Sequence, residues 1–183
     1  MKRTFLALEL PDVVREEFSQ LISDFSNFTT DQVKWVEDQN LHITIQFIGD
    51  TRDDHISKIS QICSGLFSRI KKPELFLPSL EIIPGNFPRI IWIEFKTDCR
   101  EIFKISREIR SRLRDLGYKL DKKPLKLHTT LGRVKKRLPE ALVKKILTTR
   151  IENSSIILPG ASFYHSILRP QGPIYNLITS YQF

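Results

Sequence analysis

Two copies of a His-x-Thr pattern, about half a chain apart, are the residues of this sequence best suited to catalysis. The first copy lies in LHITIQFIGD, where His42 and Thr44 alternate with apolar residues, and the second lies in LHTTLGR, with His128 and Thr130. Alternation with a period of two is typical of a half-buried β-strand, because successive side chains point to opposite faces. Each copy therefore predicts a strand that presents its histidine and its threonine together on one face.

A pair of histidines on two such strands is suited to cleaving a phosphodiester by acid–base catalysis. Imidazole titrates near neutral pH, so one ring can accept a proton from an attacking hydroxyl group or water while the other protonates the departing oxygen. A threonine hydroxyl on the same face can donate a hydrogen bond to a non-bridging phosphate oxygen. The pattern predicts His42 and His128 as catalytic residues, and Thr44 and Thr130 as substrate-binding residues.

Other chemistries find less support, although a single histidine on a strand is more often structural than catalytic. A zinc site needs three or four ligands, and neither motif has a nearby cysteine, HxH or HExxH pattern. The remaining histidines, His55 and His165, fall in a predicted helix and among apolar residues. No GxSxG, GxGxxG or GxxxxGK[ST] motif is present, so no nucleophile elbow or phosphate-binding glycine loop is predicted. We expect a reaction that uses no metal and no other cofactor.

The remaining periodicity predicts an α+β fold of antiparallel sheets with helices packed on them. Strand patterns often come in adjacent pairs rather than in strict alternation with helices, which argues against a doubly wound fold. No linker rich in glycine, serine or proline divides the chain, so residues 1–183 are expected to form one domain. The expected helices span residues 11–27, 52–70, 98–117 and 138–148, and the expected strands lie at RTFLALEL, VKWV, LHITIQFI, ELFLPSLEII, RIIWIEF, LKLHTTLGRV, SIILPGASFYHSIL and IYNLITSYQF.

The composition indicates a folded, basic protein that suits a polyanionic partner. The net charge is +8, from 29 Lys and Arg against 21 Asp and Glu, and 40% of the residues are hydrophobic. Basic side chains favour association with phosphates because they release counterions. Cys63 and Cys99 form no disulfide framework, and Glu9 and Pro11 interrupt the apolar N-terminal run before it could serve as a signal peptide. We expect a cytoplasmic location and no membrane partner, since no stretch has the length of a membrane span.

Taken with their flanks, the two motifs resemble those of the 2H phosphoesterase superfamily, and in particular its RNA 2′,3′-cyclic phosphodiesterase branch, also called 2′,5′-RNA ligase. RTFLALELP is similar to the opening strand of that branch, VKWV to the tryptophan-bearing strand before the first motif, PRIIWIEF to its central strand and GPIYNLI to its closing segment. The likeness covers nearly the whole chain. One departure is Leu127, which stands where the family commonly has a proline before the second histidine.

The resemblance implies a bilobal fold, in which two pseudosymmetric antiparallel sheets surround a central cleft, helices cover the outer faces and each lobe supplies one motif. It implies that water opens a terminal 2′,3′-cyclic phosphate without a metal and leaves a 2′-phosphomonoester. By the family's assignment, His42 would donate the proton to the leaving oxygen and His128 would accept one from water. Reversibility would let the same site join a cyclic phosphate to a 5′-hydroxyl group. The expected partner is RNA with 2′,3′-cyclic phosphate ends, tRNA halves included, and the expected state is a monomer.

Two further residues are expected to contact the substrate. Arg133 would point away from His128 under strict alternation, but a bulge at Gly132 would return it to the cleft. The family commonly has an arginine here, which implies a phosphate or ribose contact. Tyr175 matches the family's closing tyrosine and is expected to touch the phosphate or to order the cleft. Phe47 falls on the core side by alternation, and core packing is expected for it.

Two alternatives stay open at this point. The chain could be another 2H phosphodiesterase that acts on a different cyclic or linear phosphodiester. It could instead be a basic RNA-binding module in which His42 and His128 have a structural role or have lost catalysis. Replacement of either histidine separates these classes, because an enzyme would lose turnover while it kept its affinity for RNA.

Overall fold

Strands and helices form where the hydrophobic patterns predict them. The computed structural model describes residues 1–84, 90–170 and 172–183. The described residues form nine strands, four α-helices and one short 3₁₀ helix. In chain order these are β1 (Lys2–Leu8), α1 (Asp12–Ser26), β2 (Val33–Trp35), η1 (Asp38–Asn40), β3 (Ile43–Thr51), α2 (Asp53–Phe67), β4 (Glu74–Ile83), β5 (Ile90–Lys96), α3 (Arg100–Asp115), β6 (His128–Val134), α4 (Glu140–Thr148), β7 (Ser155–Ile157), β8 (Gly160–Ile167) and β9 (Ile174–Gln182).

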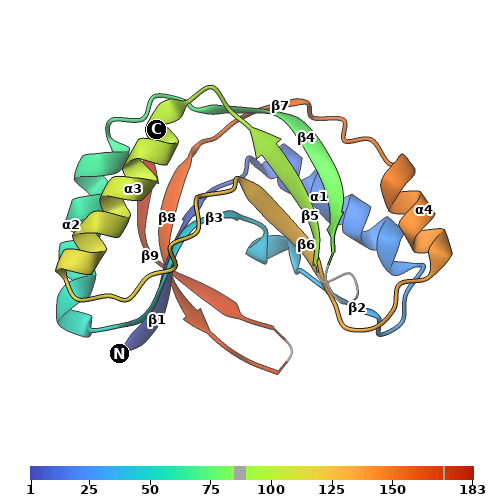
Figure 1. The fold of residues 1–183 in the computed structure, drawn as a ribbon, viewed down its shortest axis with the longest axis horizontal. Coiled ribbons are helices and arrows are strands. Elements are labelled where there is room, and N and C mark those ends of the chain that lie inside the picture. The colour runs from blue at the N-terminus through green and yellow to red at the C-terminus, as the bar shows by residue number, and fades with distance from the viewer. Residues whose placement is uncertain (85–89, 171) are drawn as a thin grey trace.

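The strands build two lobes, so the expected bilobal α+β fold is confirmed. They pair antiparallel in the order β7-β4-β5-β6-β3-β1-β8-β9, and β2 pairs with β6 off this path. Helices α2 and α3 cover the lobe of β3, β1, β8 and β9, whereas α1 and α4 lie over the lobe of β6, β5 and β4 (Figure 1). The expectation of two sheets needs one refinement, because the ladder continues from one lobe into the other.

The lobes meet where β3 joins β6, the two strands that carry the His-x-Thr motifs. In the described part of the chain these strands share one registered pair, Ile43 opposite Thr129, and both of these side chains are fully buried. In an antiparallel register this pair places each histidine beside the threonine of the other motif. An approximate twofold axis through the pair therefore relates the motifs, and both present their polar side chains to the same side.

The helices are amphipathic and bury one apolar stripe against the strands. In α3 the buried side chains recur every three or four residues, as expected for a helix with one face on a core; they are Ile102, Ile105, Ile109 and Leu113. Gly117, with a φ of +91°, follows the end of α3 and lets the chain turn in the left-handed conformation. Within the residues that the structure describes, no helix is long and apolar enough to cross a membrane.

Bulges in β3 change which of its side chains reach the cleft. Ile45 and Ile48 are extra residues relative to the neighbouring β1, so the alternation shifts by one after each of them. Gln46 is consequently buried, whereas Phe47 is 59% exposed and lines the cleft. The prediction that Phe47 packs in the core is therefore wrong.

A bulge in β6 likewise changes which side chains after the second motif face the cleft. Leu131 is the extra residue relative to β5, and the shift in alternation returns Arg133 to the side of the cleft, as expected from Gly132. Gly132 is also where β2 packs most closely. A Cβ atom there would lie 2.6 Å from Cγ1 of Val33, so a larger residue would displace β2.

Candidate active site

A cavity of about 790 Å³ lies where the lobes meet, large enough for a nucleotide-sized ligand. The six residues predicted to form the site come from β3, β6 and β9 and the segment just before β3, and the structure brings all of them together on the wall of this cavity: His42, Thr44, His128, Thr130, Arg133 and Tyr175. Two half-buried tryptophans, Trp35 and Trp92, line it as well, although their strand patterns favour packing roles.

Each catalytic candidate is oriented by the backbone carbonyl two residues before it. Nδ1 of His42 lies 2.7 Å from the carbonyl oxygen of Asn40, and Nδ1 of His128 lies 2.9 Å from that of Lys126. Because a carbonyl oxygen only accepts hydrogen bonds, each Nδ1 must carry a hydrogen. The Nε2 atom of each ring is therefore the one that can exchange a proton.

Thr44 adds a contact within the first motif. Its Oγ1 lies 3.0 Å from Nε2 of His42, so the hydroxyl donates a hydrogen bond to this nitrogen when the ring is neutral. The contact holds the threonine hydroxyl next to the reactive nitrogen of His42, so both can face the same group of a ligand.

Asn40 is a supporting residue that sequence reasoning missed. It ends η1, is 6% exposed, and its Nδ2 donates a hydrogen bond of 3.0 Å to the carbonyl oxygen of Pro173. That bond ties the segment before β3 to the segment before β9. The carbonyl that orients His42 is therefore fixed by a contact between distant parts of the chain.

An aromatic side chain from the adjacent strand packs against each histidine. Phe5 of β1 has its ring centroid 5.0 Å from that of His42, and Trp92 of β5 has its centroid 4.3 Å from that of His128. Tyr175 meets His42 edge-on at 5.4 Å. The contacts of Phe5 and Trp92 repeat the approximate twofold symmetry of the motifs, and Tyr175 is an additional contact on the side of His42.

Burial lowers the pKa of both histidines below the ordinary 6.5. The effect is large for His42, whose pKa falls to about 4, with the carbonyl of Asn40 acting in the opposite direction. His128 is more open, and its pKa is lowered by burial against the opposing effects of the Lys126 carbonyl and Glu94. Both rings are therefore mostly neutral at neutral pH in the free protein.

Arg133 adds a positive charge to the cavity near His128 and Tyr175. Its guanidinium opposes protonation of His128, and it also acts on Tyr175, whose pKa burial raises and Arg133 lowers. The charge of Lys126 is partly compensated, because its Nζ lies 3.3 Å from Oε2 of Glu94 and 5.5 Å from the Trp92 ring centroid. Arg133 thus lies where an anion between the two histidines would be attracted.

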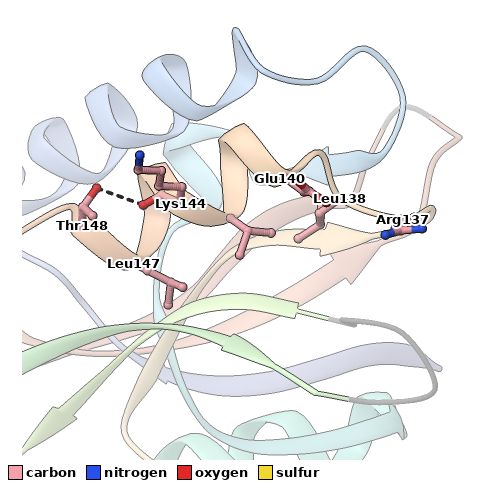
Figure 2. A pocket seen from close by; sticks show the side chains of 7 residues that line it. Arg137, Leu138, Glu140, Lys144, Leu147 and Thr148 are labelled. Atoms are coloured by element: carbon pink, nitrogen blue, oxygen red, sulfur yellow. Dashed lines mark hydrogen bonds between the residues drawn. The ribbon is translucent and has the colours of Figure 1, made fainter.

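A second cavity, of about 550 Å³, lies along α4 (Figure 2) and shares no lining residue with the histidine cavity. The residues that line this second cavity are Arg137, Leu138, Glu140, Val143, Lys144, Leu147 and Thr148. It contains no histidine, so we place the candidate site in the histidine cavity.

Among residues 1–84, 90–170 and 172–183, no group of three or more His, Cys, Asp or Glu side chains is placed to hold a metal ion.

Comparison with known proteins agrees with the motifs. The chain matches the family model described as LigT like Phosphoesterase over residues 8–92 and 95–175, ranges that contain both motifs. The RNA 2′,3′-cyclic phosphodiesterase of Methanocaldococcus jannaschii is 33% identical over 184 residues, 96% of this chain and 98% of that protein. The protein of the same name from Archaeoglobus fulgidus is 30% identical, covering 95% of this chain and 96% of the relative.

Solved structures share the fold at lower sequence identity. The protein TT0787 of Thermus thermophilus has a TM-score of 0.74 at 21% identity, covering 98% of this chain and 97% of that one. E. coli LigT complexed with 3′-AMP has a TM-score of 0.73 at 21% identity, covering 100% and 97%. The resemblance predicted from the two His-x-Thr motifs is confirmed, and the chain belongs to the LigT-like family of 2H phosphoesterases.

Proposed function

We propose that this protein is an RNA 2′,3′-cyclic phosphodiesterase that hydrolyses a terminal 2′,3′-cyclic phosphate to a 2′-phosphomonoester. The observation that carries the proposal is the pair of histidines, His42 and His128, that line one cavity with Nδ1 bonded to a carbonyl and Nε2 left for proton exchange. Relatives that match this chain over nearly its whole length carry the same name.

In the proposed reaction, water attacks phosphorus opposite the bond to O3′. Nε2 of His128 accepts the proton of the water as the new P–O bond forms, and Nε2–H of His42 gives its proton to O3′ as the P–O3′ bond breaks. The phosphate stays on O2′. A 5′-hydroxyl group in place of water would take the same path and give a 2′,5′ link, so the site would also support ligation without ATP.

The threonines and Arg133 hold the phosphate during these steps. The hydroxyl groups of Thr44 and Thr130 donate hydrogen bonds to its non-bridging oxygens, and the guanidinium of Arg133 adds a charge-assisted contact. Tyr175 packs edge-on against His42 and orders that side of the cleft. The bound anion favours the imidazolium form of both histidines and raises their pKa values from those of the free protein.

The pH dependence of activity should follow from these pKa values. The form with one proton on the pair is populated from about pH 4, the pKa of His42, up to the pKa of His128, which burial lowers below the ordinary 6.5. We expect kcat/KM to be bell-shaped with its maximum in this range, and the kcat profile to lie at higher pH because the anion holds the proton. Initial rates at constant ionic strength would give both profiles. A kcat/KM that keeps rising into alkaline pH would contradict the assignment.

The direct test of the function is an oligoribonucleotide that ends in a 2′,3′-cyclic phosphate. Incubated with the protein in the presence of EDTA, it should be converted to a product whose phosphate is mapped to the 2′ oxygen. A 3′-phosphate product would contradict the proposed direction of ring opening, and a strict need for a divalent metal would contradict the two-histidine mechanism.

The proposal also covers the RNA substrates, the oligomeric state and the cellular location. The substrates would be RNAs with cyclic phosphate ends, tRNA halves among them, bound by a monomer that acts as one domain over residues 1–183. The net charge of +8 suits such polyanions. A cytoplasmic location fits Cys63 and Cys99, which are both free thiols in the structure.

A further inference from the structure

Arg110 differs from the other arginines of α3. Arg107, Arg112 and Arg114 are exposed, as expected for the polar face of an amphipathic helix. Arg110 is half-buried and lines the histidine cavity. Helix α3 packs against β3 (Figure 1). Arg110 therefore reaches the cavity from outside the two motif strands.

Gln46 holds this arginine in place. Nε of Arg110 donates a hydrogen bond of 3.2 Å to Oε1 of Gln46, and Nε2 of Gln46 donates one of 2.7 Å to the carbonyl oxygen of Phe47. Gln46 is 6% exposed, because the bulge at Ile45 turns it inward. The amide is fixed by its second hydrogen bond, so it offers its oxygen to Nε and leaves the two terminal amino groups of the guanidinium for another ligand.

Arg110 forms no ion pair in the part of the chain that the structure describes. Within the residues that the structure describes, no carboxylate lies within ion-pair distance of it, and residues 85–89 and 171 contain no Asp or Glu. A half-buried arginine is usually paired with an anion. Lys119, from the segment that follows α3, also lines the cavity, and Asp121 of the same segment pairs with Lys123 at 4.0 Å. Basic side chains therefore outnumber acidic ones on this part of the wall.

The position of Arg110 indicates which anion it would bind. Its partner Gln46 lies two residues beyond Thr44 on β3, with the bulge at Ile45 between them. Arg110 is therefore anchored farther along β3 than the threonine that is proposed to hold the reacting phosphate. The spacing suits a second phosphate farther along the same nucleic acid strand.

We infer that Arg110, positioned by Gln46, binds the phosphate on the 5′ side of the terminal nucleoside, so that the cleft selects RNA ends over cyclic mononucleotides. The inference rests on the proposed function and adds a second phosphate site to it. A nucleoside 2′,3′-cyclic phosphate lacks this phosphate, whereas every RNA end carries it.

The test compares adenosine 2′,3′-cyclic phosphate with the same nucleotide phosphorylated on its 5′ oxygen. We expect the wild-type protein to have the higher kcat/KM for the 5′-phosphorylated form. Arg110→Gln should lower the ratio of the two kcat/KM values about tenfold or more, the size expected for a charge-assisted hydrogen bond. Arg107→Gln is the matched control, since it removes an exposed arginine one turn away and should leave both values unchanged.

Two further measurements separate binding from a structural role. On a single-stranded oligonucleotide, the plot of log kcat/KM against log salt should be less steep for Arg110→Gln by about 0.7, the change expected for one lost phosphate contact. Gln46→Met keeps the arginine and removes its acceptor, so it should lose part of the preference for the 5′-phosphorylated substrate.

Three outcomes would overturn the inference. If Arg110→Gln lowers kcat/KM equally for both substrates, Arg110 only holds α3 against β3. If the wild-type protein hydrolyses both substrates equally well, the second phosphate site is absent while the proposed function stands. If it hydrolyses neither substrate nor the oligoribonucleotide, the proposed function fails and the inference fails with it.

Discussion

Replacement of His42 or His128 with asparagine is expected to lower kcat/KM for a cyclic phosphate end by about 10²- to 10⁴-fold, because each variant loses one partner in proton transfer. Asparagine cannot exchange a proton near neutral pH, although it keeps a polar side chain in the cavity. The double variant should lose little more than the less active single variant, since the two rings act as one unit. Steady-state kinetics on the oligoribonucleotide, with thermal unfolding of each variant, would measure these effects.

Measuring the RNA affinity of the His42 and His128 variants would distinguish an enzyme from an RNA-binding module. RNA affinity should fall far less than turnover, because Arg133 and the threonines of the cavity still contact the phosphate. His165→Asn is a suitable control, since His165 lies in β8 and does not line the cavity. Equal losses of affinity and turnover in a folded variant would favour an RNA-binding module.

The two motif threonines should contribute next most to catalysis. Thr44→Val and Thr130→Val remove a hydroxyl group at nearly constant volume, and each should lower kcat/KM by about 10²- to 10³-fold if it donates to a developing phosphate charge. Thr44→Val should have a further effect on the pH profile, because its hydroxyl also donates to Nε2 of His42. Removing this donor favours protonation of the ring, so the acidic limb of kcat/KM should move to higher pH.

Thr129 supplies a matched control within the same strand. Its side chain is fully buried on the core face, and its Oγ1 has no hydrogen-bond partner in the described structure. Thr129→Val should therefore leave kcat/KM unchanged and should not lower the free energy of unfolding. Thr44→Ser and Thr130→Ser should retain most of the activity. Full activity in both valine variants would remove the threonines from the mechanism.

The two halves of the proposed catalytic pair could be predicted from sequence to lie on strands because each half is local. A strand with a period of two fixes His42 and Thr44 on one face whatever its partners are, and the same holds for His128 and Thr130. The family resemblance then supplied what local patterns do not contain, namely that the two strands meet. The structure places them side by side at one registered pair.

Residues that depend on distant contacts could not be predicted in this way. Phe47 reaches the cleft because β3 bulges against β1, and a bulge depends on both partner strands. Asn40 acts through a bond to a carbonyl 133 positions later. The contact of Arg110 with Gln46 spans 64 positions, and helical periodicity gives no reason to separate Arg110 from the other arginines of α3.

The approximate twofold axis between the motifs bears on the regiochemistry of the reaction. O2′ and O3′ flank the phosphorus of a cyclic phosphate almost equivalently, so turning the substrate about this axis would exchange the oxygen that leaves. The two motifs alone would treat both orientations alike. The side chains around them differ, because Phe5 and Tyr175 both contact His42, whereas Trp92 contacts His128. If the motifs supply the chemistry as proposed, the unsymmetrical walls of the cleft would decide which oxygen keeps the phosphate.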